Sequence, residues 1–114
     1  MKILTLCELG LNRSVTAKWM LQFRDHQVLA AGTKNLSRDT LKMLYDWADR
    51  IILLDKSLEA KADVPPSKLT VWDVGSDTYP HHFNPDLLAR LRKLAAAEPE
   101  GFWSRASSSA PLPR

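Results

Sequence analysis

The chain has little sulfur and no long apolar segment. It contains one cysteine in 114 residues, and no apolar run approaches the roughly 18 residues that a membrane-spanning helix needs. A single cysteine excludes an internal disulfide framework and leaves a reduced thiol. Met1 and Lys2 lead into an apolar stretch without the pattern of a signal peptide. We therefore expect a cytoplasmic protein with no membrane partner.

The net charge is also small. The 16 lysines and arginines and 13 acidic residues leave a net charge of +3, and the cations are scattered along the chain. This mild balance suits an anionic substrate and does not indicate nucleic acid. His81 and His82 are adjacent, so their side chains diverge and make a poor metal site. The sequence predicts no metal and no cofactor.

The remaining composition is that of a compact domain. With 45 per cent hydrophobic residues, 114 residues suffice for one core and leave no room for a second. Apolar runs predict strands and helical periodicity predicts helices, and the two kinds alternate along the chain. This order implies a single three-layer α/β domain, with a parallel sheet covered by helices on both faces. The expected strands are 2–6, 27–31, 50–54 and 69–72, and the expected helices are 14–25, 38–47, 56–62 and 84–96.

Apolar periodicity also predicts which helix faces are buried. In the first helix Val15, Trp19 and Phe23 recur at every fourth position, so we expect them to face the core. Ser37 is a predicted N-cap of the second helix, and Asn84 with Pro85 opens the last. The other core-facing residues expected on these helices are Ala17, Met20, Leu21, Leu41, Leu44, Tyr45, Leu87, Leu88, Leu91 and Leu94.

The periodic pattern stops after Leu94, which divides the chain into a domain at 1–96 and a tail at 97–114. The tail is rich in serine and proline, a composition typical of disorder. Phe102 and Trp103 are its two adjacent aromatic residues. They either dock on the body or on a partner, or form a fortuitous apolar pair, and the sequence favours the second interpretation.

The segment after the first strand carries the strongest functional pattern. Cys7 ends that strand, five residues separate it from Arg13, and Ser14 begins a helix. A loop that enters a helix N-terminus presents backbone N–H groups and the positive end of the helix dipole to an anion. Arg13 adds a planar fork of donors that matches two phosphate oxygens, and the same positive field favours the thiolate of Cys7. Gly10 permits a positive φ within the loop.

Two plainer interpretations compete with this one. A lone cysteine is commonly a small buried hydrophobic residue, and an arginine six positions later is a coincidence of moderate frequency. The strand before Cys7, the helix after Arg13, Gly10 and Ser14 are separate requirements. Because chance matches seldom meet all of them, the sequence favours a phosphate-binding loop.

This pattern resembles the low-molecular-weight protein tyrosine phosphatase family, whose signature is Cys, five residues, Arg, then Ser or Thr. Residues 29–33 are similar to the family's Ser-Ala-Gly-Thr segment, and residues 47–56 are similar to its Ala-Asp-x-Ile-Leu-x-Met-Asp segment. The similarity covers about residues 1–94. It implies the strand order 2-1-3-4, which puts Cys7 in the crevice at the carboxyl end of the first strand.

The resemblance also implies roles for individual residues. Cys7 is the expected nucleophile, Arg13 the phosphate ligand and Asp77 the general acid, with Asp73 as the alternative acid. Asp55 matches a family aspartate that supports the loop, although it also suits a helix cap. Trp72 either lines the pocket or belongs to the core. The residues expected to bind substrate are Glu8, Leu9, Gly10, Leu11, Asn12, Ser14 and Tyr79.

Several positions depart from the family pattern. Asn12 replaces the second loop cysteine, Glu8 brings a carboxylate near the phosphate, and Thr78 follows the expected acid where the family has proline. The segment between Gly32 and Ser37 is short, so the loop that covers substrate in larger members is trimmed.

The function expected from the resemblance is hydrolysis of phosphotyrosine or a similar phosphomonoester through a phosphocysteine, with a phosphorylated protein or a small phosphomonoester as partner. Three alternatives stay open: a phosphate-binding or phosphoprotein-binding module without turnover, an arsenate reductase that uses an external thiol, and a phosphocysteine carrier.

Overall fold

A four-stranded parallel sheet forms the centre of the molecule. The computed structural model describes residues 1–9, 12–75 and 83–103. The strands are β1 (Lys2–Cys7), β2 (Gln27–Gly32), β3 (Arg50–Leu53) and β4 (Leu69–Val71), and their order in the sheet is β2-β1-β3-β4. All three pairings are parallel. The expected strand order 2-1-3-4 is confirmed.

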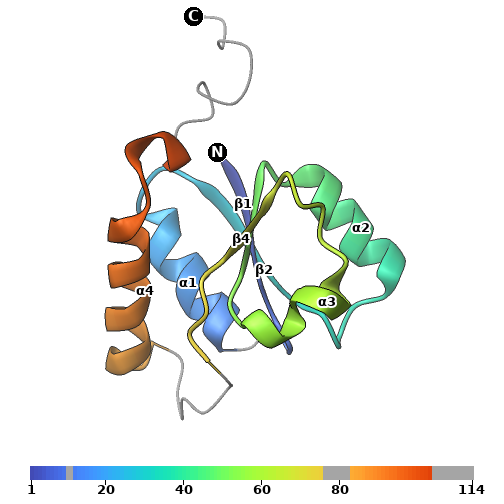
Figure 1. Cartoon of the computed structure of the whole chain (residues 1–114), viewed down its shortest axis with the longest axis horizontal. Helices are drawn as coiled ribbons and strands as arrows, with labels where there is room; N and C mark the ends of the chain where they lie inside the picture. Colours follow the sequence, from blue (N-terminus) through green and yellow to red (C-terminus); the bar gives the residue numbers. More distant parts are fainter. Residues whose placement is uncertain (10–11, 76–82, 104–114) are drawn as a thin grey trace, which may run out of the picture.

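Helices cover both faces of this sheet, as Figure 1 shows. Helices α1 (Arg13–Gln22) and α4 (Pro85–Ala97) lie on one face. Helix α2 (Arg38–Trp47) and the short helix α3 (Glu59–Ala62), which follows the 3-10 turn η1 (Lys56–Leu58), lie on the other. The expected three-layer α/β fold is confirmed, and α1 ends earlier than expected, at Gln22.

Burial explains why β1 and β3 are apolar without alternation. A central parallel strand is covered on both faces, so both of its faces must be apolar. Successive residues of one strand point to opposite faces, so each strand supplies both layers. The core under α1 and α4 includes Ile3 and Ile52, whereas the core under α2 and α3 includes Leu4 and Ile51. None of the four side chains is accessible to solvent.

Two helices begin at the predicted caps. The Ser37 hydroxyl accepts a hydrogen bond from the Thr40 backbone N–H at 3.1 Å, which satisfies one unpaired donor of α2. Asn84 Oδ1 accepts from the N–H groups of Asp86 and Leu87 at 2.9 and 3.4 Å, and Pro85 occupies the first helical position. Both predicted helix starts are confirmed.

The predicted buried face of α1 is partly wrong. Ala17 and Leu21 are buried as expected, whereas Trp19 and Phe23, which were also expected to face the core, are 38 and 71 per cent exposed. The exposed rings of Trp19 and Phe23 pack edge-to-face with centroids 5.1 Å apart, and Phe83 lies 5.1 Å from Trp19. The first turn of α1 carries the functional residues inward, so the helix is rotated away from its most apolar stripe.

This orientation of α1 predicts a contrast between two neighbouring residues. We expect Leu21→Ala to lower the free energy of unfolding by about 3 kcal/mol, because it leaves a cavity in the core. Phe23→Ala removes a larger but mostly exposed ring, so its cost should stay below about 0.5 kcal/mol. Urea denaturation of both variants measures the difference. Equal losses of unfolding free energy in the two variants would contradict this orientation of α1.

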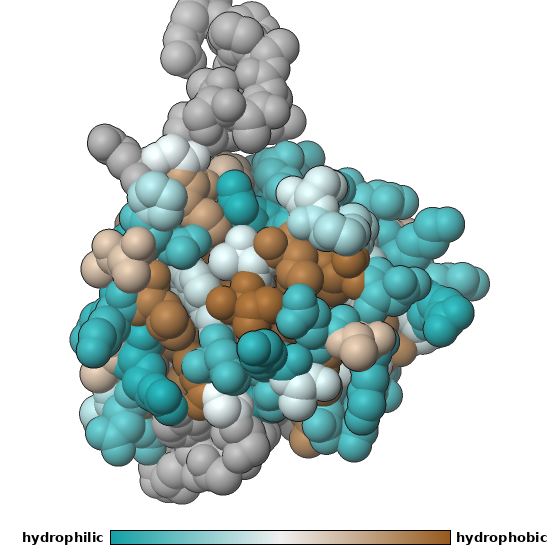
Figure 2. All heavy atoms as spheres, viewed as in Figure 1, coloured by the Kyte–Doolittle hydropathy of each residue, from teal (hydrophilic) through white to brown (hydrophobic). Residues whose placement is uncertain are grey.

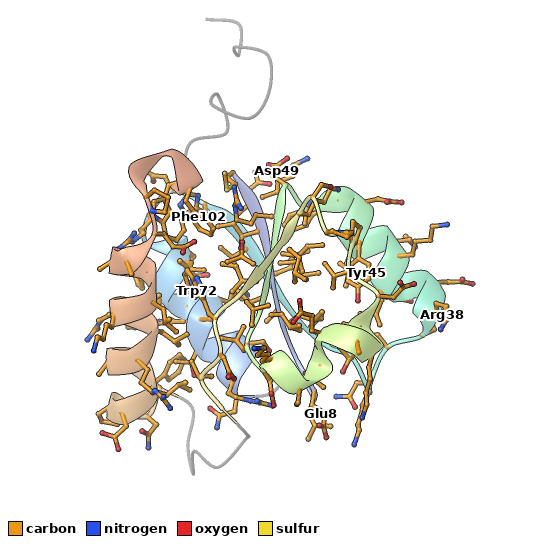
Figure 3. All side chains as sticks on the ribbon, in the orientation of Figure 1. Glu8, Arg38, Tyr45, Asp49, Trp72 and Phe102 are labelled. Atoms are coloured by element: carbon orange, nitrogen blue, oxygen red, sulfur yellow. The ribbon has the colours of Figure 1, made fainter. Side chains whose placement is uncertain are left out.

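Residues beyond the expected domain boundary at 96 also belong to the core. The 3-10 turn η2 (Glu100–Trp103) follows α4, and Phe102 is only 7 per cent exposed. Its ring stacks on that of Trp72 at a centroid distance of 6.3 Å, on the side of the sheet that α4 covers (Figure 3). The sequence favoured a fortuitous apolar pair, whereas the structure shows the alternative interpretation, in which Phe102 docks on the body of the domain. Residues 104–114 lie outside the described part of the chain.

One face of the molecule is drawn in space-filling form in Figure 2. Apolar side chains gather near the middle of that face, with hydrophilic side chains around them. The edge strand β4 crosses this view in Figure 1, and its three residues are half-buried. Within residues 1–9, 12–75 and 83–103, no helix has the length and apolar character required to cross a bilayer.

Candidate active site

The sheet topology places Cys7 at the carboxyl edge of the central strand β1. Cys7 pairs with Gly32 of β2, and its carbonyl accepts a hydrogen bond from the Thr33 N–H at 2.9 Å. On the other side of β1, the Leu54 N–H donates to the Leu6 carbonyl at 2.9 Å. Strands on both sides therefore fix the last residues of β1. In open parallel sheets, ligands bind in the crevice at this edge.

A buried threonine attaches the N-terminus of α1 to the strand that bears Cys7. The Thr5 hydroxyl donates to the Ser14 carbonyl at 2.7 Å, and neither residue is exposed to solvent. Cys7 Sγ and Ser14 Oγ lie 3.2 Å apart. A hydroxyl at this distance can donate to the sulfur when the thiol ionises. Ser14 thus joins the first turn of α1 to the Cys7 side chain.

Arg13 is almost completely buried, with 1 per cent of its surface exposed. Its Nη1 atom donates to Asp55 Oδ2 at 3.0 Å and to the Gly75 carbonyl at 2.6 Å. Its Nε–H is buried and has no partner among the described residues. An unsatisfied buried donor on a charged group is costly, and an oxyanion ligand would satisfy it. Arg13 is thus anchored by one nitrogen and keeps another for binding.

Asp55 orients Arg13 and also caps the turn that follows β3. Asp55 Oδ1 accepts from the Ser57 N–H at 3.0 Å and from its hydroxyl at 2.8 Å, while Oδ2 faces Arg13. Burial opposes ionisation, but the hydrogen bonds from Ser57 and Arg13 outweigh it and lower the pKa of Asp55. The two roles considered for Asp55, loop support and helix cap, are therefore both present.

The lowered pKa of Asp55 predicts a pH-dependent loss of stability. The carboxylate stabilises the fold fully above its ordinary pKa of 3.8, and this contribution is lost as the pH falls through the lower folded-state pKa. At pH 7 we expect Asp55→Asn to reduce the free energy of unfolding by about 2 kcal/mol, because Arg13 loses its buried counter-ion. As the pH falls below 3.8, the difference from wild type should shrink.

Urea denaturation at several pH values measures this difference. Asp46→Asn is the matched control, because Asp46 is exposed and its carboxylate has no ion pair or hydrogen bond within the described residues. A constant difference between Asp55→Asn and wild type across the acidic range would contradict the role given to the Asp55 carboxylate.

Glu8 and Leu9 begin the loop and are held by the connection between β2 and α2. Glu8 Oε1 forms a salt bridge with Lys34 Nζ at 2.8 Å. The hydrogen bond and the charge of Lys34 lower the pKa of Glu8. The Asn35 amide donates to the Leu9 carbonyl. Lys34 thus balances the negative charge of Glu8, the residue that departs from the family pattern.

Asp73, the alternative general acid, is engaged in a turn. Its Oδ1 accepts from the Gly75 N–H at 3.1 Å and from the Lys56 N–H at 3.3 Å. Gly75 has a φ of +83°, which residues other than glycine rarely adopt. In this conformation the Gly75 carbonyl accepts the hydrogen bond from Arg13 Nη1. Asp73 therefore supports the wall of the site through the backbone.

Sequence reasoning did not identify Gly75 as a partner of Arg13. Its only sequence signal is a glycine soon after a strand, which also fits any ordinary turn. Trp72 is 1 per cent exposed and belongs to the core, so its alternative role as a pocket wall is wrong. Asn12 precedes α1, and its carbonyl accepts from the Thr16 N–H at 2.8 Å. The predictions that fall outside the described residues are those for Gly10, Leu11, Asp77, Thr78, Tyr79, His81 and His82.

Fold and site together define a three-layer α/β protein with a thiol, a hydroxyl and a buried arginine where the central strand meets its helix. No protein-family model, no curated protein and no solved structure matches this chain. Among the residues that the structure describes, no three histidine, cysteine or acidic side chains form a cluster suited to a metal ion.

Proposed function

We propose that the protein is a cysteine-dependent phosphatase that hydrolyses phosphotyrosine or a similar phosphomonoester. The observation that carries this proposal is the state of Arg13, which is 1 per cent exposed, oriented through Nη1 and without a partner for its Nε–H among the described residues. A protein core tolerates such a group when a ligand completes its hydrogen bonds. A tetrahedral oxyanion beside the Cys7 thiol supplies those bonds.

The reaction proceeds in two displacements. In the first, the Cys7 thiolate attacks phosphorus, an S–P bond forms, the P–O bond breaks, and the leaving oxygen takes a proton from Asp77. In the second, Asp77 accepts a proton from water, water oxygen attacks phosphorus, and the S–P bond breaks to release inorganic phosphate and the Cys7 thiolate. The Ser14 hydroxyl, 3.2 Å from the sulfur, stabilises the thiolate as nucleophile and as leaving group.

Charge stabilisation comes from two sources in this proposal. Arg13 and the N-terminus of α1 direct positive charge toward the oxygens that gain negative charge as the phosphoryl group transfers. Asp55 and the Gly75 carbonyl hold Arg13 in place before substrate arrives, so little reorganisation is needed. The fold therefore holds these positive groups in position before the substrate binds.

The direct test is to trap the covalent intermediate. Wild-type protein is mixed with an aryl phosphate at about pH 5 to 7, quenched in acid, digested and analysed by mass spectrometry. We expect one phosphoryl group on the peptide that contains Cys7 and a burst of phenol matching the protein concentration. Phenol release without phosphoryl transfer to Cys7, or no release across this pH range, would refute the proposal.

The general acid is tested by two aspartate variants. We expect Asp77→Ala to lower kcat for a substrate with a poor leaving group by about 100-fold, because the leaving oxygen then departs unprotonated. The kcat of Asp77→Ala for an activated nitrophenyl phosphate should fall much less, because nitrophenolate leaves readily without a proton. Asp73→Ala is the comparison variant. It disturbs the turn whose Gly75 carbonyl holds Arg13, so it should lower kcat for both substrates to a similar extent. A loss confined to the substrate with the poor leaving group in Asp73→Ala, and absent in Asp77→Ala, would transfer the acid role to Asp73.

A further inference from the structure

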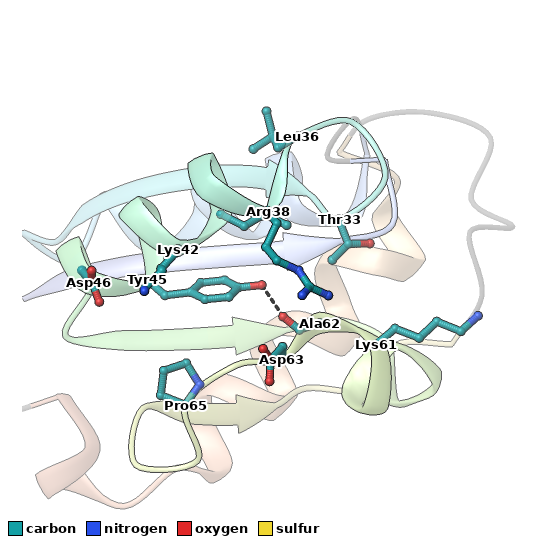
Figure 4. A pocket seen from close by; sticks show the side chains of 11 residues that line it. Thr33, Leu36, Arg38, Lys42, Tyr45, Asp46, Lys61, Ala62, Asp63 and Pro65 are labelled. Atoms are coloured by element: carbon teal, nitrogen blue, oxygen red, sulfur yellow. Dashed lines mark hydrogen bonds between the residues drawn. The ribbon is translucent and has the colours of Figure 1, made fainter.

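A cavity of about 510 Å³ opens between α2 and α3, on the face of the sheet opposite α1. Figure 4 shows the ring of Tyr45 lying along it, with its hydroxyl bonded to the Ala62 carbonyl. Burial, with a smaller effect of Asp63, raises the pKa of Tyr45, so this hydroxyl remains a neutral donor. Leu41 adds to the apolar lining. The cavity thus has a built apolar wall held by a hydrogen bond.

The cavity shares a wall with the candidate active site. Thr33 lines the cavity, and its N–H donates to the Cys7 carbonyl at 2.9 Å. The next residue, Lys34, bonds Glu8 through its backbone and its side chain. Because Gly32 pairs with Cys7 and neighbouring strands are about 4.8 Å apart, the backbone of Thr33 lies within about 10 Å of that of Cys7, a distance that two or three residues of an extended peptide span. The Cys7 side chain belongs to the core under α1 and α4, so a peptide bound at Cys7 reaches the cavity over the carboxyl edge of the sheet.

The short connection between β2 and α2 leaves the cavity open. Only residues 33–37 separate Gly32 from Arg38, and the backbone of Thr33 and Lys34 bonds Cys7 and Glu8. So few residues, tied to the phosphate loop on one side, cannot fold back over the gap between α2 and α3. A substrate that extends from Cys7 across this connection therefore meets the open cavity.

Charge is unevenly distributed along the cavity. Arg38, Lys42 and Lys61 line it together with two carboxylates, Asp46 and Asp63. Asp46 lies at the end away from Thr33, about 12 Å along the axis of α2 from Arg38, whereas Lys61 extends at the end near Thr33 (Figure 4). Lys61 also contributes to the lowered pKa of Glu8, which places its charge toward the phosphate loop.

The cations at the end near Thr33 are available to a ligand. No ion pair or hydrogen bond within the described residues engages the charged groups of Arg38 and Lys61. Asp63 lies near Ala62 and the Tyr45 hydroxyl, deeper along the cavity than Lys61 (Figure 4). The end beside the phosphate loop therefore carries two cations, Arg38 and Lys61, whereas further along the cavity the cation Lys42 is accompanied by the carboxylates Asp46 and Asp63.

We propose that this cavity is a specificity subsite that takes an acidic side chain of a phosphopeptide, two or three residues from the phosphorylated one. The acidic group lies between Arg38 and Lys61 at the end beside the phosphate loop, and its aliphatic stem contacts Leu41 and Tyr45. The carboxylates Asp46 and Asp63 keep acidic groups out of the rest of the cavity. This inference rests on the proposed function, because the phosphate at Cys7 sets the register of the peptide.

The experiment compares two phosphotyrosine peptides, one with glutamate at the second and third positions on each side and one with alanine there. Wild-type protein should show a lower KM for the acidic peptide, and the double variant Arg38→Ala/Lys61→Ala should raise that KM about fivefold. The kcat for both peptides, and hydrolysis of a nitrophenyl phosphate, should not change. Arg92→Ala/Lys93→Ala is the matched control, because it removes the same charge from exposed positions of α4.

A failure of the subsite proposal can be distinguished from a failure of the phosphatase proposal. Peptide affinity is also measured in the Cys7→Ser background, where binding is read without turnover. No hydrolysis by wild type, with tighter binding of the acidic peptide that depends on Arg38 and Lys61, refutes the phosphatase and supports the subsite. Equal affinity for the two peptides, or an equal effect of the α4 control, overturns the subsite whether or not the protein is a phosphatase.

Discussion

Cys7→Ser should abolish hydrolysis of an aryl phosphate while leaving the phosphate site intact. We expect kcat to fall by about 10⁴-fold or more, because a serine hydroxyl here has no base to ionise it and the alkoxide is a far poorer leaving group. Affinity for inorganic phosphate should change less than about threefold, since the donors that bind the oxyanion are Arg13 and the loop. Steady-state kinetics and calorimetric titration with phosphate measure the two quantities.

The kcat and the phosphate affinity of Cys7→Ser have to be interpreted together. Serine has the same branching as cysteine with a smaller, more polar atom at its tip, so Cys7→Ser should disturb the core that Cys7 joins only locally. Loss of activity together with loss of phosphate affinity would point to a disrupted site and would require a fold measurement by circular dichroism. Retained activity would exclude Cys7 as the nucleophile. Phosphate affinity in a wild-type protein without turnover would identify the non-catalytic binding module.

Local signals in the sequence were sufficient for most of the fold. The strand before Cys7, the caps at Ser37 and Asn84 and the apolar run of β3 each depend on a few neighbouring residues, and all are present. Alternation of strands and helices restricts the sheet to parallel pairing. The strand order followed from the family resemblance alone, because periodicity within segments carries no information about which strands are neighbours.

The orientation of α1 shows where local signals fail. Periodicity selects the stripe through Trp19 and Phe23, yet the buried side holds Ser14, Thr16 and Ala17. The hydrogen bond from Thr5 to the Ser14 carbonyl and the ion pair of Arg13 fix the rotation of this helix. These contacts join α1 to Thr5 of β1 and to Asp55 after β3, so no pattern within α1 can reveal them. The contacts of the candidate site therefore outweigh the hydrophobic pattern of the helix.

The two contacts of Arg13 also join distant segments. Asp55 follows β3 and Gly75 follows β4, and the two converge on Arg13 because the sheet places β3 beside β1 and β4 beside β3, with their carboxyl ends at the same edge. The docking of Phe102 on Trp72 likewise joins distant segments. Arg13 itself carried a sequence signal, namely its spacing from Cys7. For Asp55 the only signal was its match to a family aspartate, and for Gly75 it was a position soon after a strand, so their roles are best examined by mutation of Arg13, the residue that they hold.

Arg13→Lys is expected to lower kcat/KM by about 10³-fold although the positive charge is kept. Lysine offers a single ammonium group, which cannot donate to Asp55 and the Gly75 carbonyl and also present a second, fixed donor to phosphate. Removal of one such donor to an oxyanion costs about 10² to 10³-fold, and loss of the fixed geometry adds to it. The measurement is kcat/KM for an aryl phosphate, with the inhibition constant of inorganic phosphate alongside.

Arg50→Lys provides the matched control for that loss. Arg50 also has a buried Nε–H without a partner among the described residues, but its guanidinium lies over the Phe102 ring at 4.0 Å, and it begins β3 at the opposite edge of the sheet. Its replacement should affect stability and leave kcat/KM within about twofold. Because both variants exchange the same residue types in partly or fully buried positions, equal kinetic losses would mean that Arg13 acts through folding, whereas a loss confined to Arg13→Lys identifies it as the phosphate ligand.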